Sequence, residues 1–274
     1  MAENDDVTQR PVTAQNFTEA EVDARIHRFT TAGGMNHGLV YDTPTPTDDQ
    51  PVPRMNRDTL YAGIPIDTIQ GYSITLPEHP EDRYVSAYVF DNDHMTLHFL
   101  RGSGVTYTFE AQEATRWVVA IIRVQLFDPS NEADVEATRE ILSRAKVESG
   151  SMQEKPLPGR DWQAMLDLRH QYEVQYRDVR QVPAADWQGY RGDVDRYGGH
   201  NIAVASAWGC SLTLKPSTST SSPDCRPKGA SKRPTWSPTT MPSGASPSMT
   251  ARATCSRTTA TSIAQRRRTT RTGP

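Results

Sequence analysis

Two stretches of very different composition meet at about residue 209, and this break limits what the chain can fold into. The first 209 residues carry 19 Lys and Arg against 32 Asp and Glu, whereas the last 65 carry 11 against a single acid, Asp224. Those last 65 residues hold 26 Ser and Thr, 8 Pro and all three Cys, but no Phe, Tyr, Val, Glu, Asn or His. Such a composition cannot build a periodic apolar face. We therefore expect a folded domain over 17–209, with disordered segments at 1–16 and 210–274.

The acidic body begins with a helical pattern. Apolar residues recur at helical spacing, namely Val22, Ile26 and Phe29. Thr18 and Glu21 have the spacing of a capping box, and the glycine pair at 33–34 is expected to end the helix. The Pro-rich stretch TPTPTDDQPVP that follows is expected to be a loop.

From residue 72 the hydrophobic period changes to two, which is typical of half-buried strands. Five such segments are separated by turn residues: 72–76, 83–91, 95–100, 105–110 and 116–127. Two helical patterns follow, over 131–144 and 161–177, and then an apolar run at 202–208 for which the sequence offers no partner element. We predict an α+β fold in which an antiparallel sheet of about five strands carries an N-terminal helix and two further helices, followed by a disordered tail.

The ordered segments of the body resemble those of a known bacterial family. They are Met55-Asn56-Arg57-Asp58-Thr59-Leu60-Tyr61, GYSITLPEHPEDRYVSAYVFDNDH and TRWVVAIIRVQLFDPSNEADV. The family is the domain of unknown function numbered 1254, and the resemblance extends from about Phe17 to Gly209. It implies no established reaction. Proteins similar to this one usually continue into a second, jelly-roll-like domain, numbered 1214, which is marked by a segment like DNDAFWSITVYD. This sequence contains no such segment.

A reading shifted by one base is compatible with the missing segment. In the shifted frame, each codon consists of the last base of one present codon and the first two bases of the next. The codons of Met241-Pro242 then give Ala, and those of Met249-Thr250 give Asp, whichever synonymous codons are used. The codons between them permit Phe-Trp-Ser-Ile-Thr-Val-Tyr, so the shifted reading can be AFWSITVYD. We hypothesise that one nucleotide was lost near the codon for Gly209. The alternative is a basic disordered tail that is encoded as it stands.

The first candidate site is the polar block Asn56, Arg57, Asp58 and Tyr61. It lies at a loop-to-strand junction, where an Arg–Asp pair can hold the turn or face a ligand pocket. A structural ion pair is the commoner outcome at such a junction. Asp58 is our candidate catalytic carboxylate, and Asn56, Arg57 and Tyr61 are candidate ligand contacts.

The second candidate is His94, which follows the turn-forming sequence Asp-Asn-Asp at 91–93. It is our candidate general base, with Asp58 or Asp93 to orient it. On a strand His94 and His98 would lie about 13 Å apart, too far to share a metal ion, and a His at a turn exit is usually only hydrogen-bonded. We therefore expect no metal site.

The third candidate is the Gly-rich loop around Arg196 and His200, both of which we assign as ligand-binding residues. Its paired glycines permit either close approach of the backbone to a ligand or positive φ at a domain junction. Arg191 and Arg196 suit an anionic small molecule. The strongly acidic body disfavours nucleic acid as a partner.

Several classes of protein are excluded by missing signals. The sequence has no G-x-S-x-G, G-x-G-x-x-G, Walker A or H-E-x-x-H motif, and with every Cys beyond residue 209 the body has no thiol chemistry. We expect no cofactor. The longest apolar run, 117–122, is too short to cross a bilayer, and the start MAENDD does not have the pattern of an export signal. These features predict no membrane span and a cytoplasmic location, although the proteins that the chain resembles are often exported.

Two functional classes remain. One is a hydrolase or small-ligand enzyme whose pocket lies between two domains in intact relatives, and which is inactive in the present sequence. The other is a non-catalytic binding or envelope-associated module built on a β-sandwich. The sequence fixes neither the substrate nor the oligomeric state.

Overall fold

The computed structural model describes residues 9–48, 50, 55–111, 114–178, 187–192, 194 and 197–209. Within them lie α1 (Phe17–Gly33), β1 (Leu39–Tyr41), β2 (Thr59–Thr75), β3 (Val85–Asp91), β4 (Thr96–Arg101), β5 (Thr106–Phe109), β6 (Trp117–Gln125), α2 (Glu132–Ser143), β7 (Lys146–Ser151), α3 (Trp162–Asp178) and α4 (Gly199–Ser206). The strands form one seven-stranded sheet in which the described pairings are antiparallel, which confirms the predicted α+β class. The tail predicted to be disordered, 210–274, lies outside the described residues.

The long strand β2 takes part in two regions of the sheet. Its first half, 59–67, pairs with β6, and the main strand order is β1-β2-β6-β3-β4. Its second half, 72–75, pairs with β5 on one side and β7 on the other. The register with β7 shifts between Asp67 and Tyr72, and Gly71 has φ +80° in this interval. A glycine accepts that backbone conformation without a steric penalty, so the strand changes direction here.

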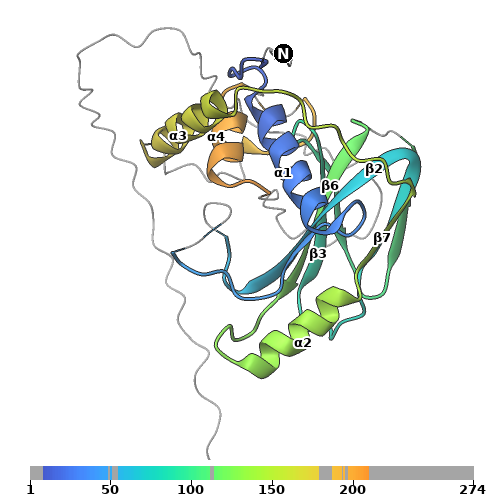
Figure 1. Ribbon diagram of the computed structural model, residues 1–274. Coiled ribbons are helices and arrows are strands. Elements are labelled where there is room, and N and C mark those ends of the chain that lie inside the picture. The colour runs from blue at the N-terminus through green and yellow to red at the C-terminus, as the bar shows by residue number, and fades with distance from the viewer. Residues whose placement is uncertain are drawn as a thin grey trace, which may run out of the picture. The chain divides into compact units, whose positions relative to one another are not determined.

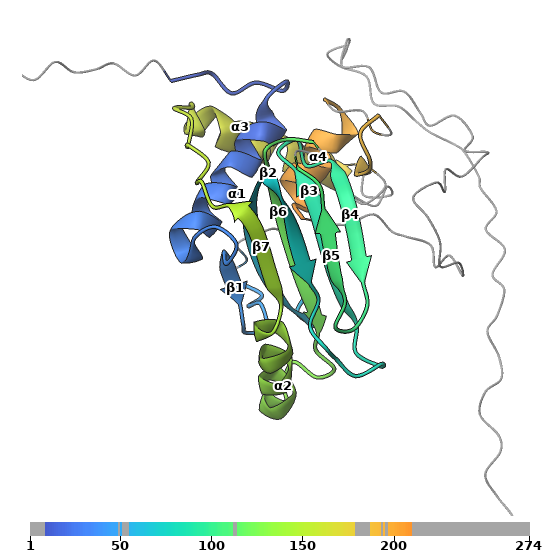
Figure 2. The same cartoon turned by 90° about the vertical axis from the view of Figure 1, so that its right-hand side faces the viewer.

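Each face of the sheet carries a separate core. One face contributes Leu60, Ala62 and Ile122 to a cluster that includes Val135 and Ile141 of α2. The other face contributes a second cluster with α1, α3 and α4; its members from the sheet include Tyr61, Tyr88, Phe90, Val119 and Ile121. Figure 1 and Figure 2 show α1, α3 and α4 gathered together, with α2 at the opposite end of the sheet.

The five predicted strand segments are confirmed, but β1, β7 and the first half of β2 were not predicted as strands. The residues of β2 from Thr59 to Thr68 are all buried, so this part shows no alternation for a periodicity argument to detect. It also contains Gly63 and Pro65, which weaken the strand signal further. Strand β7 has a single apolar residue, Val147.

The helical pattern predicted to end at the glycine pair 33–34 is confirmed as α1, and the predicted helices over 131–144 and 161–177 are confirmed as α2 and α3. The predicted capping box of α1 is wrong. Asn16 is the N-cap residue and makes no side-chain cap bond, while the Thr18 hydroxyl donates to Asn201 Oδ1 at 2.7 Å. Glu21 accepts two hydrogen bonds from Arg169 of α3. The side chains of Thr18 and Glu21 are therefore bonded to distant elements and do not cap the helix.

The expectation that the apolar run at 202–208 lacks a partner is also wrong. The run forms most of α4 and the turn after it, and α4 packs against both α1 and α3. Residues 202–206 of α4 are buried. These partner helices lie far away in the sequence, so no local pattern could identify them.

The chain is ordered before α1 in the part that the structure describes. Val12 is buried, and Arg10 exchanges backbone hydrogen bonds with Gly159 (3.0 Å) and Asp161 (2.9 Å). Residues 9–16 therefore depart from the disordered N-terminus that we expected over 1–16. A short segment with one buried apolar residue has no periodicity that would reveal this contact.

No helix in the described part of the chain is long and apolar enough to span a bilayer.

Gly63 of β2 is expected to be essential for the contact between the sheet and α1. A Cβ atom at this position would lie 2.6 Å from Cζ of Phe29. We expect Gly63→Ala to destabilise the fold by about 1–3 kcal/mol through overpacking, measured by urea unfolding. Phe29→Leu should lower the free energy of unfolding less in the Gly63→Ala background than in the parent protein. As a control, Thr108→Ala at an exposed position of β5 should leave the free energy of unfolding nearly unchanged. Additive effects of the two core substitutions would contradict this contact.

Candidate functional site

Two of the predicted site residues meet in the second core. His94 lies in the turn after β3, and His200 lies in the first turn of α4. Their ring centroids are 6.1 Å apart, and both residues have an exposed fraction of 0%. The sequence singled out these histidines separately, and the fold brings them together across more than a hundred residues.

The turn that carries His94 is built on Asp91. The Asp91 carboxylate accepts hydrogen bonds from the backbone N–H groups of Asp93 and Met95, both at 2.9 Å, so the predicted Asp-Asn-Asp turn is confirmed. Burial raises the pKa of Asp91, although bonds from Met95 and Arg191 act in the opposite direction. His94 follows in the left-handed region, with φ +56°. This conformation directs the chain back toward β4.

The His94 ring is held by the end of the described chain. The backbone N–H of Gly209 donates to His94 Nε2 at 2.9 Å, whereas Nδ1 is buried and has no partner in hydrogen-bonding geometry. Burial, reinforced by the neighbouring His200, lowers the pKa of His94 well below its ordinary value. The ring is therefore neutral at physiological pH. Because Nε2 accepts, its one proton lies on Nδ1.

The second ring, His200, joins α4 to two other segments. Its Nε2 lies 2.9 Å from the carbonyl oxygen of Asp93, and its Nδ1 lies 3.2 Å from the carbonyl oxygen of Trp187. One side chain thus ties the start of α4 to the turn after β3 and to the segment before α4.

Aromatic side chains surround His94. Its ring centroid lies 4.2 Å from that of Phe90 and 5.5 Å from that of Trp208. The guanidinium of Arg25, from α1, lies 5.5 Å from the Trp208 ring, and the buried Trp208 Nε1 has no hydrogen-bond partner. The shell excludes water from the imidazole and leaves two ring N–H groups without acceptors among the described residues.

Two arginines near this centre bind groups of the chain itself. Arg191 donates to the carboxylates of Asp91 and Asp93, the second at 2.9 Å. Its suggested contact with an anionic small molecule stays a prediction. Arg123 of β6 donates to the carbonyl oxygen of Gly209 and lies 5.9 Å from the ring of Tyr61. Tyr61 is buried, and this burial raises the pKa of its hydroxyl.

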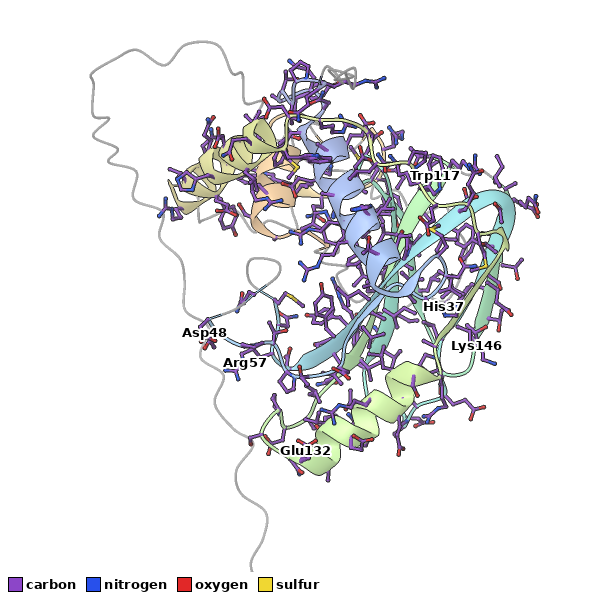
Figure 3. The ribbon with its side chains drawn as sticks, viewed as in Figure 1. His37, Asp48, Arg57, Trp117, Glu132 and Lys146 are labelled. Atoms are coloured by element: carbon purple, nitrogen blue, oxygen red, sulfur yellow. The ribbon has the colours of Figure 1, made fainter. Side chains whose placement is uncertain are left out.

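The other predicted site residues lie elsewhere. Asn56, Arg57 and Asp58 are exposed, and Figure 3 shows Arg57 at the margin of the described fold, away from α3 and α4. Asp58 accepts a bond from the hydroxyl of its neighbour Thr59 at 3.2 Å and does not contact His94. No ion pair between Arg57 and Asp58 occurs in the described part of the chain. Arg196 lies outside the described residues.

A buried carboxylate that sequence reasoning missed is Asp23 of α1. It accepts bonds from Arg160 Nε (3.0 Å) and Nη2 (2.6 Å), from Lys155, and from Asn92 Nδ2 at 3.3 Å. These contacts tie α1 to the segment before α3 and to the turn that carries His94. The sequence shows only that Asp23 adjoins the apolar positions of the helix. This pattern could not predict its cationic partners, which lie more than 130 residues away.

The described side chains contain no group of three or more His, Cys, Asp or Glu residues placed to hold a metal ion.

Comparisons with known proteins show a distant structural likeness. No family profile matches the sequence, and no curated protein matches it. The chain is similar to the crystal structure of the VPA0106 protein from Vibrio parahaemolyticus, with a TM-score of 0.46 and 14% identity. The similarity covers 73% of this chain and 68% of that one.

Asp23→Asn is expected to destabilise the fold by about 3–5 kcal/mol, because Arg160 and Lys155 would lose the charge that compensates their burial. Urea unfolding monitored by Trp fluorescence measures the effect. Glu19→Gln is the matched control: Glu19 also pairs with Arg160, at 2.9 Å, but it is 42% exposed, so its loss should cost less than about 1 kcal/mol. Equal effects of the two substitutions would refute the central role of Asp23.

Proposed function

We propose that this chain provides the first lobe of a two-lobed bacterial protein of the 1254/1214 type, and that this lobe is a non-catalytic binding module. One observation favours a binding module over a hydrolase. His94, the best candidate base, accepts the backbone N–H of Gly209 at 2.9 Å in a fully buried site.

A general base must reach the proton that it removes. The lone pair of His94 that would take this proton is the one on Nε2, and the Gly209 N–H already uses it. The candidate carboxylate Asp58 is exposed on a different part of the sheet and does not orient the imidazole. The histidine therefore serves as an acceptor for the backbone.

The proposal of a second lobe rests on the sequence and on the anchoring of Gly209. The compositional break and the shifted reading both place the change at about residue 209. The backbone of Gly209 is bound on both sides, its N–H by His94 and its carbonyl by Arg123. These bonds would fix the point from which a second lobe continues.

A second candidate, a small-ligand protein, is favoured by the unpartnered atoms His94 Nδ1 and Trp208 Nε1. Buried N–H donors without acceptors call for an explanation, and a small acceptor molecule is one. A rise in melting temperature with sodium acetate that is absent from Trp208→Phe, where the donor is removed and the ring is kept, would favour this candidate over the first.

Sequencing the gene across codon 209 tests the second lobe directly. We expect the correct DNA to contain one more nucleotide there and to encode AFWSITVYD in the restored frame. A confirmed frame without that nucleotide would remove the second lobe from the proposal and would leave the tail as encoded.

The frame-restored protein is expected to hydrolyse neither p-nitrophenyl acetate nor p-nitrophenyl phosphate above the buffer rate, because His94 is buried with its Nε2 bonded to Gly209 and the exposed Asp58 does not contact it. The release of p-nitrophenol, followed by absorbance, measures this. Asp58→Asn and His94→Asn should behave as the parent does. Turnover that either variant abolishes while it keeps its circular dichroism spectrum would establish the hydrolase instead.

A further inference from the structure

The two buried histidines make opposite demands on protonation. Both ring nitrogens of His200 face carbonyl oxygens, of Asp93 at 2.9 Å and of Trp187 at 3.2 Å. A carbonyl oxygen only accepts, so both bonds form only when the ring carries a proton on each nitrogen. His94 Nε2 faces the backbone N–H of Gly209, which only donates, so this nitrogen must carry no proton.

We propose that this pair is an acid-sensitive latch in which His200 holds a proton, His94 stays neutral, and protonation of His94 releases the backbone at Gly209. The latch consists of His94, His200 and Gly209. It acts on the end of α4 and does not depend on the function proposed above.

The groups around His94 favour a neutral His94 beside a protonated His200. Arg25 of α1 lies behind the Trp208 ring, and Arg123 of β6 binds the Gly209 carbonyl. The carboxylates of Asp91 and Asp93, on the turn itself, are both bound by Arg191. From β3, Tyr88 contributes a neutral hydroxyl, which is paired with Thr96 Oγ1 at 3.1 Å. A proton on His94 would thus be added to a ring whose centroid lies 6.1 Å from that of His200, with no carboxylate bonded to the His94 ring in the described contacts.

Protonation of His94 at Nε2 would place two hydrogen-bond donors opposite each other. The new Nε2–H would point at the Gly209 N–H, and a second buried charge would lack an acceptor. Withdrawal of Trp208 and Gly209 from the imidazole relieves both costs, because it admits water to the ring. The end of α4 is therefore the part that moves first.

The direction of the pH dependence follows from the depressed pKa of His94, which burial and then His200 produce. The folded state binds fewer protons at this ring than the unfolded state does. The latch is fully stable above the ordinary histidine pKa of about 6.5 and is lost as the pH falls from there toward the lower folded value.

Nitrogen-15 spectra of the histidine rings in the full-length chain test the proton order. At pH 7.5 we expect His200 to have both ring nitrogens protonated and His94 to be the neutral Nδ1–H form. Between pH 7 and pH 5, the hydrogen-exchange protection factor of the Gly209 amide, corrected for intrinsic rates, should fall at least tenfold.

His94→Asn is the informative variant. Asparagine accepts the left-handed conformation that His94 has at φ +56°, and its Oδ1 accepts a hydrogen bond without titrating in this range. Protection of Gly209 should then become independent of pH. His37→Asn, on the loop between α1 and β1, changes an exposed histidine and should keep the pH dependence of the parent (Figure 3).

Three results would overturn the latch. They are a neutral His200 ring at pH 7.5, unchanged protection of Gly209 between pH 7 and pH 5, and a His94→Asn protein that loses this protection as the parent does. If His94→Asn does not fold, the ring spectra and the Gly209 amide of the parent chain decide the question alone.

Discussion

The antiparallel pairing of β2 with β6 is the interaction on which the rest of the structure depends. It runs from Thr59↔Gln125 to Asp67↔Trp117 without a break. Both strands face two cores: Leu60 and Ile122 contribute to the cluster with α2, and Tyr61 and Ile121 to the cluster with the other helices. A slip of one residue would exchange the two sets of side chains, so the two cores together fix the register.

Buried charges connect the helices to this sheet. Asp23 and Glu21 of α1 accept bonds from cations in or just before α3, and Asp67 of β2 accepts two bonds from Arg116. Part of the acid excess of the body is therefore internal and paired. Each pair joins segments that are distant in the sequence, which makes these contacts a means of specifying one arrangement of the helices. Desolvation of the paired charges offsets much of their attraction.

Local patterns predicted the parts of the fold that depend on local physics. Short apolar and β-branched runs bounded by turn residues identified β3 to β6, although β3 is buried throughout, and helical spacing identified α1, α2 and α3. The patterns failed where Gly63 and Pro65 interrupt the first half of β2, and where apolar residues are nearly absent, as in β7. Among the site residues, a turn sequence and a glycine pair drew attention to His94 and His200. Their proximity could not be predicted, since it depends on α4 packing against α1 and α3. Asp23 was missed for the same reason.

The packing of α4 against α1 and α3 has a consequence for how the chain is made on the ribosome. Helix α1 is the first element to be synthesised, and its neighbour α4 is the last described one. At about 5–20 residues per second, roughly 10–30 s pass between the two. During that time Phe17 and Ile26, which end up fully buried, have no complete binding surface. The nascent protein thus exposes the apolar side chains of α1, which form the kind of surface that chaperones bind.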